Sequence, residues 1–258
     1  IPLPAIELDK TYNWKVNMII DTDVVEGPVW SFSTSEWVSM DIDTTGGSSS
    51  YDDSNDVTTI IADGADIWGN SDQFHYLYTT PTLTRDIGTI IARVTRLDET
   101  YQWAKAGVMF RETREANSKW VTMALTPPTN NHLASLQYRW ETGGGCGNQD
   151  VGEVYIPKWV KLVRNGSLFT GYRSEDGENW TKQGEVTVNM DSDALVGLAV
   201  TSHVVGVYTT AQFESISIST PDPRQAWNPT PRDGTENVPL YTTLSWGAGD
   251  DADEHRLY

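Results

Sequence analysis

The sequence is short of positive charge and of cysteine. It holds 18 lysine and arginine residues against 36 aspartate and glutamate residues, a formal net charge of -18 at pH 7. A surface of that sign argues against nucleic acid or an anionic membrane as a partner, because both are negatively charged. The single cysteine, Cys146, cannot form a disulfide within the chain. Zinc is not expected either, because four scattered histidines and one cysteine offer no zinc-ligand spacing.

Long apolar runs and sorting signals are also missing. The sequence has no run of 18 apolar residues, so we expect no membrane insertion. Residues 1–4 lack a basic region followed by an apolar stretch, which argues against a signal peptide, and no methionine starts the chain. We therefore expect a piece of a longer precursor. The acidic composition fits an extracellular setting, where cations screen carboxylates.

What the sequence does contain is short alternating strands between turn residues. In the run 74–78, aromatic residues at every second position fall on one face of a strand, with His75 and Leu77 on the other. Both faces are largely apolar, which predicts a strand that is covered on both sides. One helix at most is expected, at 114–119. The pattern predicts an all-β chain with an antiparallel jelly-roll sandwich over residues 36–220.

Both ends of the chain carry short aromatic strands outside that sandwich. Residues 11–20 and 27–34 predict a two-stranded hairpin, which is marginally stable in water without a partner. Prolines from position 221 onward predict a linker at 221–227, and residues 228–258 begin another strand-rich segment. The apolar side chains at the two ends that need a covering partner are Trp14, Trp30, Phe32, Leu244 and Trp246.

Clusters of oxygen-bearing residues in the predicted loops indicate calcium as a cofactor. Calcium takes six to eight oxygen ligands, and closely spaced Asp and Asn residues in turns supply them. No segment has the EF-hand spacing, and aspartate is also an ordinary turn former. The expected ligands come from the loops at 41–56 and 63–72, and they are Asp41, Asp43, Asp52, Asp53, Asn55, Asp56, Asp63, Asp66 and Asp72.

Aromatic residues at predicted strand ends and in loops indicate a second possibility, carbohydrate binding. An exposed indole can stack on a sugar ring while nearby polar groups hydrogen-bond the hydroxyls. For any single tryptophan, packing in the core is the commoner explanation. The expected sugar-contacting residues are Trp68, Trp103, Arg111, Arg139 and Trp140.

Catalysis is the class of function that the sequence supports least. Glycoside hydrolysis needs two facing carboxylates, whereas the acidic residues here lie mainly in predicted turns. The sequence has no nucleophile elbow, phosphate-binding loop or dinucleotide fingerprint. We therefore expect a protein that is not an enzyme.

Four motifs give the central part of the chain a family resemblance. They are Gly64-Ala65-Asp66-Ile67-Trp68-Gly69, Lys105-Ala106-Gly107-Val108-Met109-Phe110-Arg111-Glu112, Trp159-Val160-Lys161-Leu162-Val163-Arg164-Asn165-Gly166 and Gly197-Leu198-Ala199-Val200-Thr201-Ser202-His203. On these motifs, residues 36–220 resemble the concanavalin A-like lectin/laminin-G superfamily, especially a jelly-roll module of large secreted bacterial proteins. The resemblance implies the fold and leaves the ligand open, since members bind sugars, calcium or proteins. The Glu-x-Asp-x-x-Glu pattern of the superfamily's glycosidases is absent.

The two ends resemble one bacterial fibronectin type III/Ig-like domain cut in two. Residues 1–35 resemble its last strands and residues 228–258 its first strands. This order implies one period of a longer array, in which copies of the chain or adjacent repeats complete each other's Ig-like sandwich. The sequence therefore predicts a non-enzymatic, extracellular structural or adhesive repeat unit, assembled head to tail and stabilised by calcium. The alternative is a carbohydrate-binding module of a secreted polysaccharide-degrading enzyme.

Overall fold

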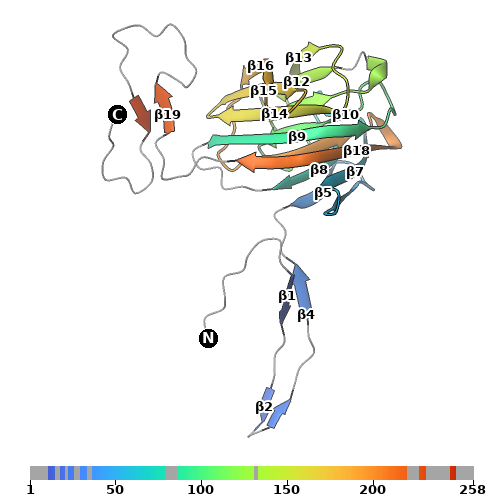
Figure 1. Ribbon diagram of the computed structural model, residues 1–258, viewed down its shortest axis with the longest axis vertical. Helices are drawn as coiled ribbons and strands as arrows, with labels where there is room; N and C mark the ends of the chain where they lie inside the picture. Colours follow the sequence, from blue (N-terminus) through green and yellow to red (C-terminus); the bar gives the residue numbers. More distant parts are fainter. Residues whose placement is uncertain are drawn as a thin grey trace. The chain divides into compact units, whose positions relative to one another are not determined.

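The computed structural model describes residues 37–79, 86–129 and 133–219 in full, together with the backbone of Asn130 and of short strands towards both ends. The chain divides into two units, Ile1–Val38 and Ser39–Tyr258. In the first unit, β1 (Thr11–Trp14) pairs antiparallel with β4 (Trp30–Ser33), and β2 (Met18–Ile20) with β3 (Asp23–Val25) (Figure 1).

The pairing of β1 with β4 confirms the predicted hairpin at the level of the backbone, with Trp14 directly opposite Trp30. Towards the other end of the chain, β19 (Trp227–Thr230) pairs with β20 (Ser245–Gly247). The predicted linker at 221–227 meets β19 at Trp227 and stays a prediction. Leu244 lies outside the described residues. The side chains of the other four apolar residues that we expected to need a covering partner lie outside them as well.

The second unit contains a sandwich of two seven-stranded antiparallel sheets, with the strand orders β13-β12-β11-β10-β17-β8-β5 and β16-β15-β14-β9-β18-β7-β6 (Figure 1). The first sheet consists of β5 (Val38–Ile42), β8 (Phe74–Thr79), β10 (Lys105–Arg111), β11 (Trp120–Leu125), β12 (Ala134–Arg139), β13 (Cys146–Val151) and β17 (Leu195–Thr201). The second consists of β6 (Ser48–Asp52), β7 (Val57–Gly64), β9 (Ile87–Leu97), β14 (Lys158–Asn165), β15 (Leu168–Ser174), β16 (Trp180–Thr187) and β18 (Val204–Ser219). The predicted jelly-roll sandwich is confirmed.

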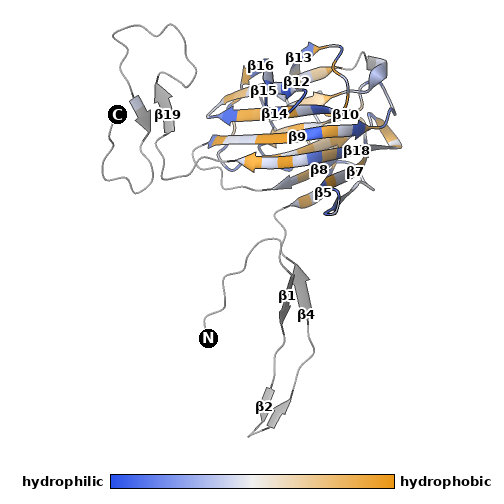
Figure 2. Cartoon of the chain, viewed as in Figure 1, coloured by the Kyte–Doolittle hydropathy of each residue, from blue (hydrophilic) through white to orange (hydrophobic). Residues whose placement is uncertain are grey.

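The main core lies between the two sheets and follows from the alternation of side chains along each strand. On β14, Val160 and Leu162 are buried, whereas Lys161 between them is half-buried on the outer face. Bands of apolar and polar residues alternate in the same way along β9, β14 and β18 (Figure 2). Phe110 of the first sheet meets Phe169 of the second edge to face, with ring centroids 5.7 Å apart. Burial of each such ring contributes about 1.5–3 kcal/mol to folding.

A second apolar layer covers the opposite, outer face of the first sheet. On β8, the aromatic side chains of Phe74, Tyr76 and Tyr78 belong to this layer, while Leu77 packs against the main core. The predicted two-sided burial of this strand is therefore confirmed. Ile67 of the loop between β7 and β8 completes the layer. The first sheet is thus covered on both faces where this loop crosses it.

Helix contributes little to the part of the chain that is described. The helix expected at 114–119 is a series of turns instead, and backbone carbonyls of this segment accept hydrogen bonds from the side chains of Arg111 and Arg139. The short 3-10 helix η2 (Pro128–Asn130) follows β11. Among the described residues, no helix combines the length and the apolar character that a bilayer crossing requires.

Candidate functional site

A pocket of about 300 Å³ opens on the outer face of the first sheet. Lys105 at the start of β10, Gln137 on β12 and Asn148 on β13 come from the sheet itself. The remaining lining residues come from three loops, and they are Asp66, Trp68, Trp103 and His203. The volume lies at the lower end of the range for small-molecule sites. Strands therefore supply one wall of the pocket, including Lys105, and loops supply its aromatic groups and its other ionisable groups.

Lys105 is the charged centre of the pocket, and only 2% of its surface is exposed. Its ammonium group donates to Asp66 Oδ1 and, at 3.3 Å, to the carbonyl of Ile67. The same nitrogen lies 5.7 Å from the ring centroid of Trp68 and 5.9 Å from that of Trp103. Both distances are within the range of a cation–π contact. Lys105 thus holds the two indoles and the carboxylate around one buried positive charge.

His203 holds Asp66 from the other side. His203 Nε2 lies 3.1 Å from Asp66 Oδ2, and its ring stacks on Tyr101 with centroids 4.8 Å apart. Burial raises the pKa of Asp66, but the hydrogen bond from His203 and the positive charge of Lys105 outweigh burial and lower that pKa below its usual value. Asp66 is therefore ionised at neutral pH, and its charge balances that of Lys105.

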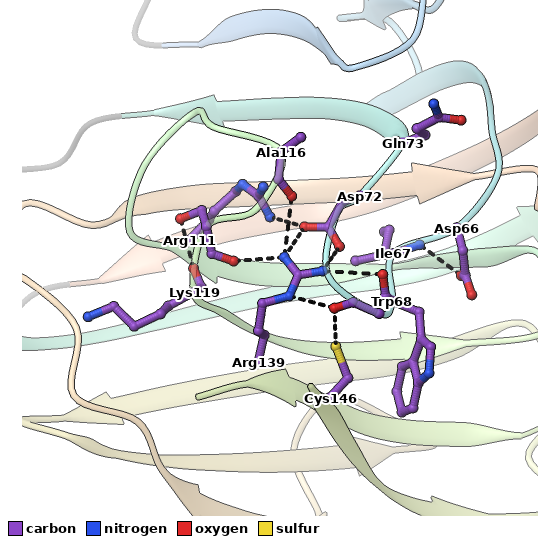
Figure 3. Close-up of polar contacts among 12 residues, drawn as sticks. Asp66, Ile67, Trp68, Asp72, Gln73, Arg111, Ala116, Lys119, Arg139 and Cys146 are labelled. Atoms are coloured by element: carbon purple, nitrogen blue, oxygen red, sulfur yellow. Dashed lines mark hydrogen bonds and ion pairs between the residues drawn. The ribbon is translucent and has the colours of Figure 1, made fainter. Parts of the chain in front are cut away.

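A buried ionic cluster of Asp72, Arg111 and Arg139 ties the loop that carries Trp68 to the sheet (Figure 3). Arg111 Nη1 and Arg139 Nη1 each lie 2.7 Å from Asp72 Oδ2, and all three side chains are fully buried. Arg139 also donates from Nε to the carbonyl of Gly69 at 2.9 Å and from Nη2 to that of Trp68 at 3.2 Å. The cluster therefore fixes the backbone that presents the Trp68 indole.

The backbone of this loop is shaped by local contacts at its two ends. Gly64 has a φ of 125°, and a Cβ atom at this position would lie 2.1 Å from the carbonyl oxygen of Gln73. Only glycine permits this close approach. The amide of Gln73 donates to the carbonyl of Asp66 at 2.7 Å, and Asp66 Oδ1 accepts from the amide of Ile67 at 2.7 Å. These contacts close the loop and leave the Asp66 carboxylate at the edge of the pocket.

The structure brings two of the five predicted sugar-contacting residues together, because Trp68 and Trp103 both line the pocket. Trp140 is 44% exposed, packs edge to face against Tyr138, and does not line it. Arg111 and Arg139 do not fit the prediction of a surface contact with sugar. They are completely buried, because each is paired with Asp72 beneath the loop.

The pocket residues that the sequence prediction missed are Lys105, Gln137, Asn148 and His203. Lys105 and His203 lie at the ends of two of the quoted motifs, as polar residues next to buried strands. Gln137 lies on the face of β12 that also carries Ser135 and Arg139, and all three polar side chains are buried. The placement of Lys105 and His203 at the ends of these motifs was therefore a signal that the sequence contained, whereas the burial of Gln137 was not.

The predicted calcium ligands are distributed among separate internal contacts. Asp41 Oδ1 lies 2.6 Å from Nδ1 of the buried His75. Asp63 accepts from Thr44 and, at 2.9 Å, from the amide of Gly206. Asp66 and Asp72 are engaged by the lysine and arginine side chains already described. Protein donors therefore occupy four of the expected carboxylates.

Of the other predicted ligands, Asp43 directly follows β5, and the remaining four lie at the exposed turn between β6 and β7. Asp52 accepts from the amide of Ser54 at 3.0 Å and from the side chain of Asn55 at 2.8 Å, as a turn-capping aspartate does. Asp56 accepts from Tyr51 and from the amide of Ser215, each at 3.2 Å, and Asp43 and Asp53 are exposed. Nowhere in the described ranges do three acidic, histidine or cysteine side chains gather as a metal site requires, and calcium stays a prediction.

Comparison with known protein families and with curated proteins finds no match for this chain. Among solved structures, it is similar to a functionally unknown protein from Saccharomyces cerevisiae, with a TM-score of 0.58 and 15% identity over 72% of this chain and 97% of that one. It is also similar to the GH43 protein BlXynB from Bacillus licheniformis, with a TM-score of 0.52 and 12% identity over 77% of this chain. The match covers 42% of the Bacillus protein, so this chain corresponds to under half of it.

The exoplasmic/lumenal domain of VIP36 in its Ca2+/Man3GlcNAc-bound form is more distant. Its TM-score is 0.42 at 9% identity, and a likeness of that degree supports no conclusion about this chain. The yeast and Bacillus structures establish the fold alone, which is the concanavalin A-like lectin/glucanase β-sandwich. The predicted resemblance is confirmed to that extent. The Ig-like resemblance of the two ends stays a prediction.

Proposed function

We propose that this chain is a carbohydrate-binding domain whose ligand occupies the pocket on the outer face of the first sheet. The observation that carries the proposal is the placement of Trp68 and Trp103 around Lys105 in a single pocket with amide side chains. Aromatic rings offer flat apolar faces for the C–H groups of a sugar ring, and a few polar groups then fix its orientation. The concanavalin A-like fold, which lectins and glucanases share, supports the same class of ligand.

The polar groups of the pocket match the hydroxyl groups of a sugar. Lys105, Asn148 and His203 carry hydrogen-bond donors, whereas Asp66 and Gln137 carry acceptors. A hydroxyl group both donates and accepts, so a mixed lining of this kind suits it. A ligand of purely apolar character would leave the buried side-chain oxygen of Gln137 without a partner, which is unfavourable.

We propose binding without cleavage. Glycoside hydrolysis generally uses a pair of carboxyl groups that face the scissile bond. Of the described residues that line the pocket, one is acidic, and that residue, Asp66, is held by Lys105 and His203. The measurement that tests this part is incubation with each bound polysaccharide, followed by an assay for new reducing ends. Release of reducing ends that depends on Asp66 would show an enzyme instead.

The binding proposal is tested by screening the whole chain against an array of immobilised plant, fungal and bacterial glycans. We expect retention on at least one polysaccharide, and loss of that retention in the double variant Trp68→Ala/Trp103→Ala. The matched control is Trp140→Ala, which removes an exposed indole outside the pocket. No retention on any glycan, or equal retention by the double variant, would contradict the proposal.

A second candidate function is the structural repeat unit predicted from the sequence, and the paired strands at both ends favour it. β1 pairs with β4, and β19 with β20, each as a sheet of two strands. Isolated two-stranded pairs are marginal in water, so we propose that copies of the chain or adjacent repeats cover them outside the cell, in a calcium-rich medium. Electron microscopy in calcium and in chelator tests this, and monomers in both conditions would contradict it.

A further inference from the structure

We propose that Gln137 determines the specificity of the pocket, which accepts a neutral sugar ring with adjacent free hydroxyls and discriminates against acidic sugars. This inference rests on the proposed carbohydrate-binding function. It names the class of sugar and the residue that selects it. The three observations that carry it concern the Gln137 oxygen, its cross-strand neighbour Asn148, and the charge of the pocket.

The side-chain oxygen of Gln137 is a buried, unsatisfied hydrogen-bond acceptor. Gln137 is 1% exposed and lines the pocket, and its Oε1 has no hydrogen-bond partner within the described part of the chain. A buried acceptor without a donor is unfavourable, because folding removes it from water without replacing the lost hydrogen bond. A ligand that brings an O–H group within hydrogen-bond distance of this oxygen would supply the donor.

Acidic groups cannot supply that donor. At neutral pH the carboxylate of a uronic acid or a sulfate ester has oxygen acceptors and no hydrogen to donate. Placed against Gln137 Oε1, such a group would set one acceptor against another in a buried site. A hydroxyl in the same place would donate to Gln137. An acidic ring must therefore turn its charged group away from Gln137 to donate from a ring hydroxyl, whereas a neutral ring has no such restriction.

Asn148 extends this recognition to a second hydroxyl. Gln137 and Asn148 are directly opposite each other on the paired strands β12 and β13, and both line the pocket. Side chains at such positions are direct neighbours on one face of a sheet. Asn148 Nδ2 donates to Asp150, which fixes the orientation of its amide. Two neighbouring amides match two neighbouring hydroxyls, because each partner contains both donors and acceptors.

The charges in and around the pocket also disfavour an anion. Lys105 is paired with Asp66, so its positive charge is already balanced. The whole chain carries a formal charge of -18, which repels an acidic polymer at a distance. An acidic sugar would have to displace Asp66 from Lys105 to gain an ion pair. A neutral sugar leaves the Lys105–Asp66 pair in place.

The inference is tested by titration calorimetry of the whole chain with two sets of hexasaccharides. The neutral set is cellohexaose, xylohexaose and mannohexaose, and the acidic set is the hexamers of galacturonic acid and of mannuronic acid. We expect at least one neutral hexamer to bind at least 10-fold more tightly than either acidic hexamer. We expect Gln137→Leu to weaken the binding of that neutral hexamer at least 10-fold.

The controls separate this inference from the proposed function. The control Gln149→Leu changes a glutamine on β13 whose side chain donates to the carbonyl of Glu185 and does not line the pocket. We expect this variant to bind the neutral hexamer with unchanged affinity. Gln137→Leu should melt no lower than the wild type, since it removes an unsatisfied buried acceptor. If Gln137→Leu does not fold, Gln137→Asn takes its place. It shortens the side chain by one methylene group and must weaken binding of the neutral hexamer to the same extent.

Each outcome has one meaning. Acidic hexamers that bind as tightly as neutral ones would overturn the inference and leave the proposed function standing, provided that Trp68→Ala weakens that binding. Unchanged affinity in both Gln137 variants would overturn the role of this residue alone. Failure of every hexamer and every arrayed glycan to bind would overturn the proposed function and the inference with it.

Discussion

Arg139 holds both carboxylate oxygens of Asp72, Oδ2 through Nη1 at 2.7 Å and Oδ1 through Nη2, and neither side chain is exposed to solvent. This two-point geometry is the strongest arrangement of an arginine–carboxylate pair. The same guanidinium group binds the carbonyl oxygens of Trp68 and Gly69. One buried ion pair therefore fixes both the sheet and the loop that presents the Trp68 indole to the pocket.

The first prediction concerns the stability that this buried ionic cluster provides. Asp72→Ala leaves Arg111 and Arg139 buried without their counter-charge, and we expect the free energy of unfolding to fall by about 3–5 kcal/mol. Urea unfolding followed by tryptophan fluorescence measures this. Asp53→Ala, which removes an exposed turn carboxylate, should change the free energy by roughly 0.5 kcal/mol or less. Equal effects of the two substitutions would show that the cluster has no special role.

The second prediction concerns the two indoles of the pocket. Trp68→Ala and Trp103→Ala each remove an aromatic wall, and we expect each to weaken binding of a retained glycan by about 2 kcal/mol, roughly 30-fold in Kd. Titration calorimetry measures the change, and circular dichroism checks the fold. Trp140→Ala should bind as the wild type does. A larger loss in Trp140→Ala than in the two pocket variants would place the site elsewhere.

The third prediction is a dependence on pH that arises from Asp66. Its pKa is lowered in the folded protein, against the effect of burial, by His203 and Lys105. The ionised carboxylate therefore stabilises the fold fully above its unfolded pKa, about 3.9, and this contribution is lost as the pH falls through the lower folded value. Asp66→Asn removes the titrating group.

Urea unfolding of the wild type and of Asp66→Asn over the range from about pH 6 to about pH 2.5 measures this contribution. We expect the difference in stability between the two proteins to be constant at the upper end and to shrink below about pH 4. A difference that grew as the pH fell would mean that the pKa of Asp66 is raised in the folded state, contrary to the geometry of the pocket.

The fourth prediction concerns Cys146, which lies under the same loop and donates from Sγ to the carbonyl of Gly69 at 3.3 Å. Burial raises the pKa of its thiol, and the pull of Arg139 does not offset this. Less thiolate is then present at about pH 8 than for a free cysteine, so we expect native protein to react more slowly with iodoacetamide than urea-unfolded protein. Reaction at the same rate in both states would show an accessible, unperturbed thiol.

The sequence was sufficient to predict the sandwich and the burial of β8, because both depend on local alternation. Phe74 and Leu77 point to opposite faces of one strand whatever their distant neighbours are. The roles of Arg111 and Arg139 could not be predicted in this way. Their partner, Asp72, lies in a loop 39 and 67 residues away in the sequence, and a charged residue in a strand is ordinarily exposed.

The roles of the acidic residues in the loops could not be predicted from the sequence either. Aspartate in a turn can bind calcium, cap the turn or pair with a buried cation, and its spacing in the sequence does not distinguish these roles. Asp52 caps a turn, whereas Asp66 pairs with Lys105. The pocket was only partly predictable for a related reason. Trp68 and Trp103 were recognisable as aromatic loop residues, but Gln137 becomes notable only once its burial is known.

The most direct measurement is a crystal structure of the protein with the hexasaccharide that binds it most tightly. We predict a sugar ring against the indole of Trp68 or Trp103, with one of its hydroxyls within hydrogen-bond distance of Gln137 Oε1. A sugar ordered only elsewhere, such as beside Trp140 or on the outer face of the second sheet, with the pocket free of sugar, would contradict the proposed site.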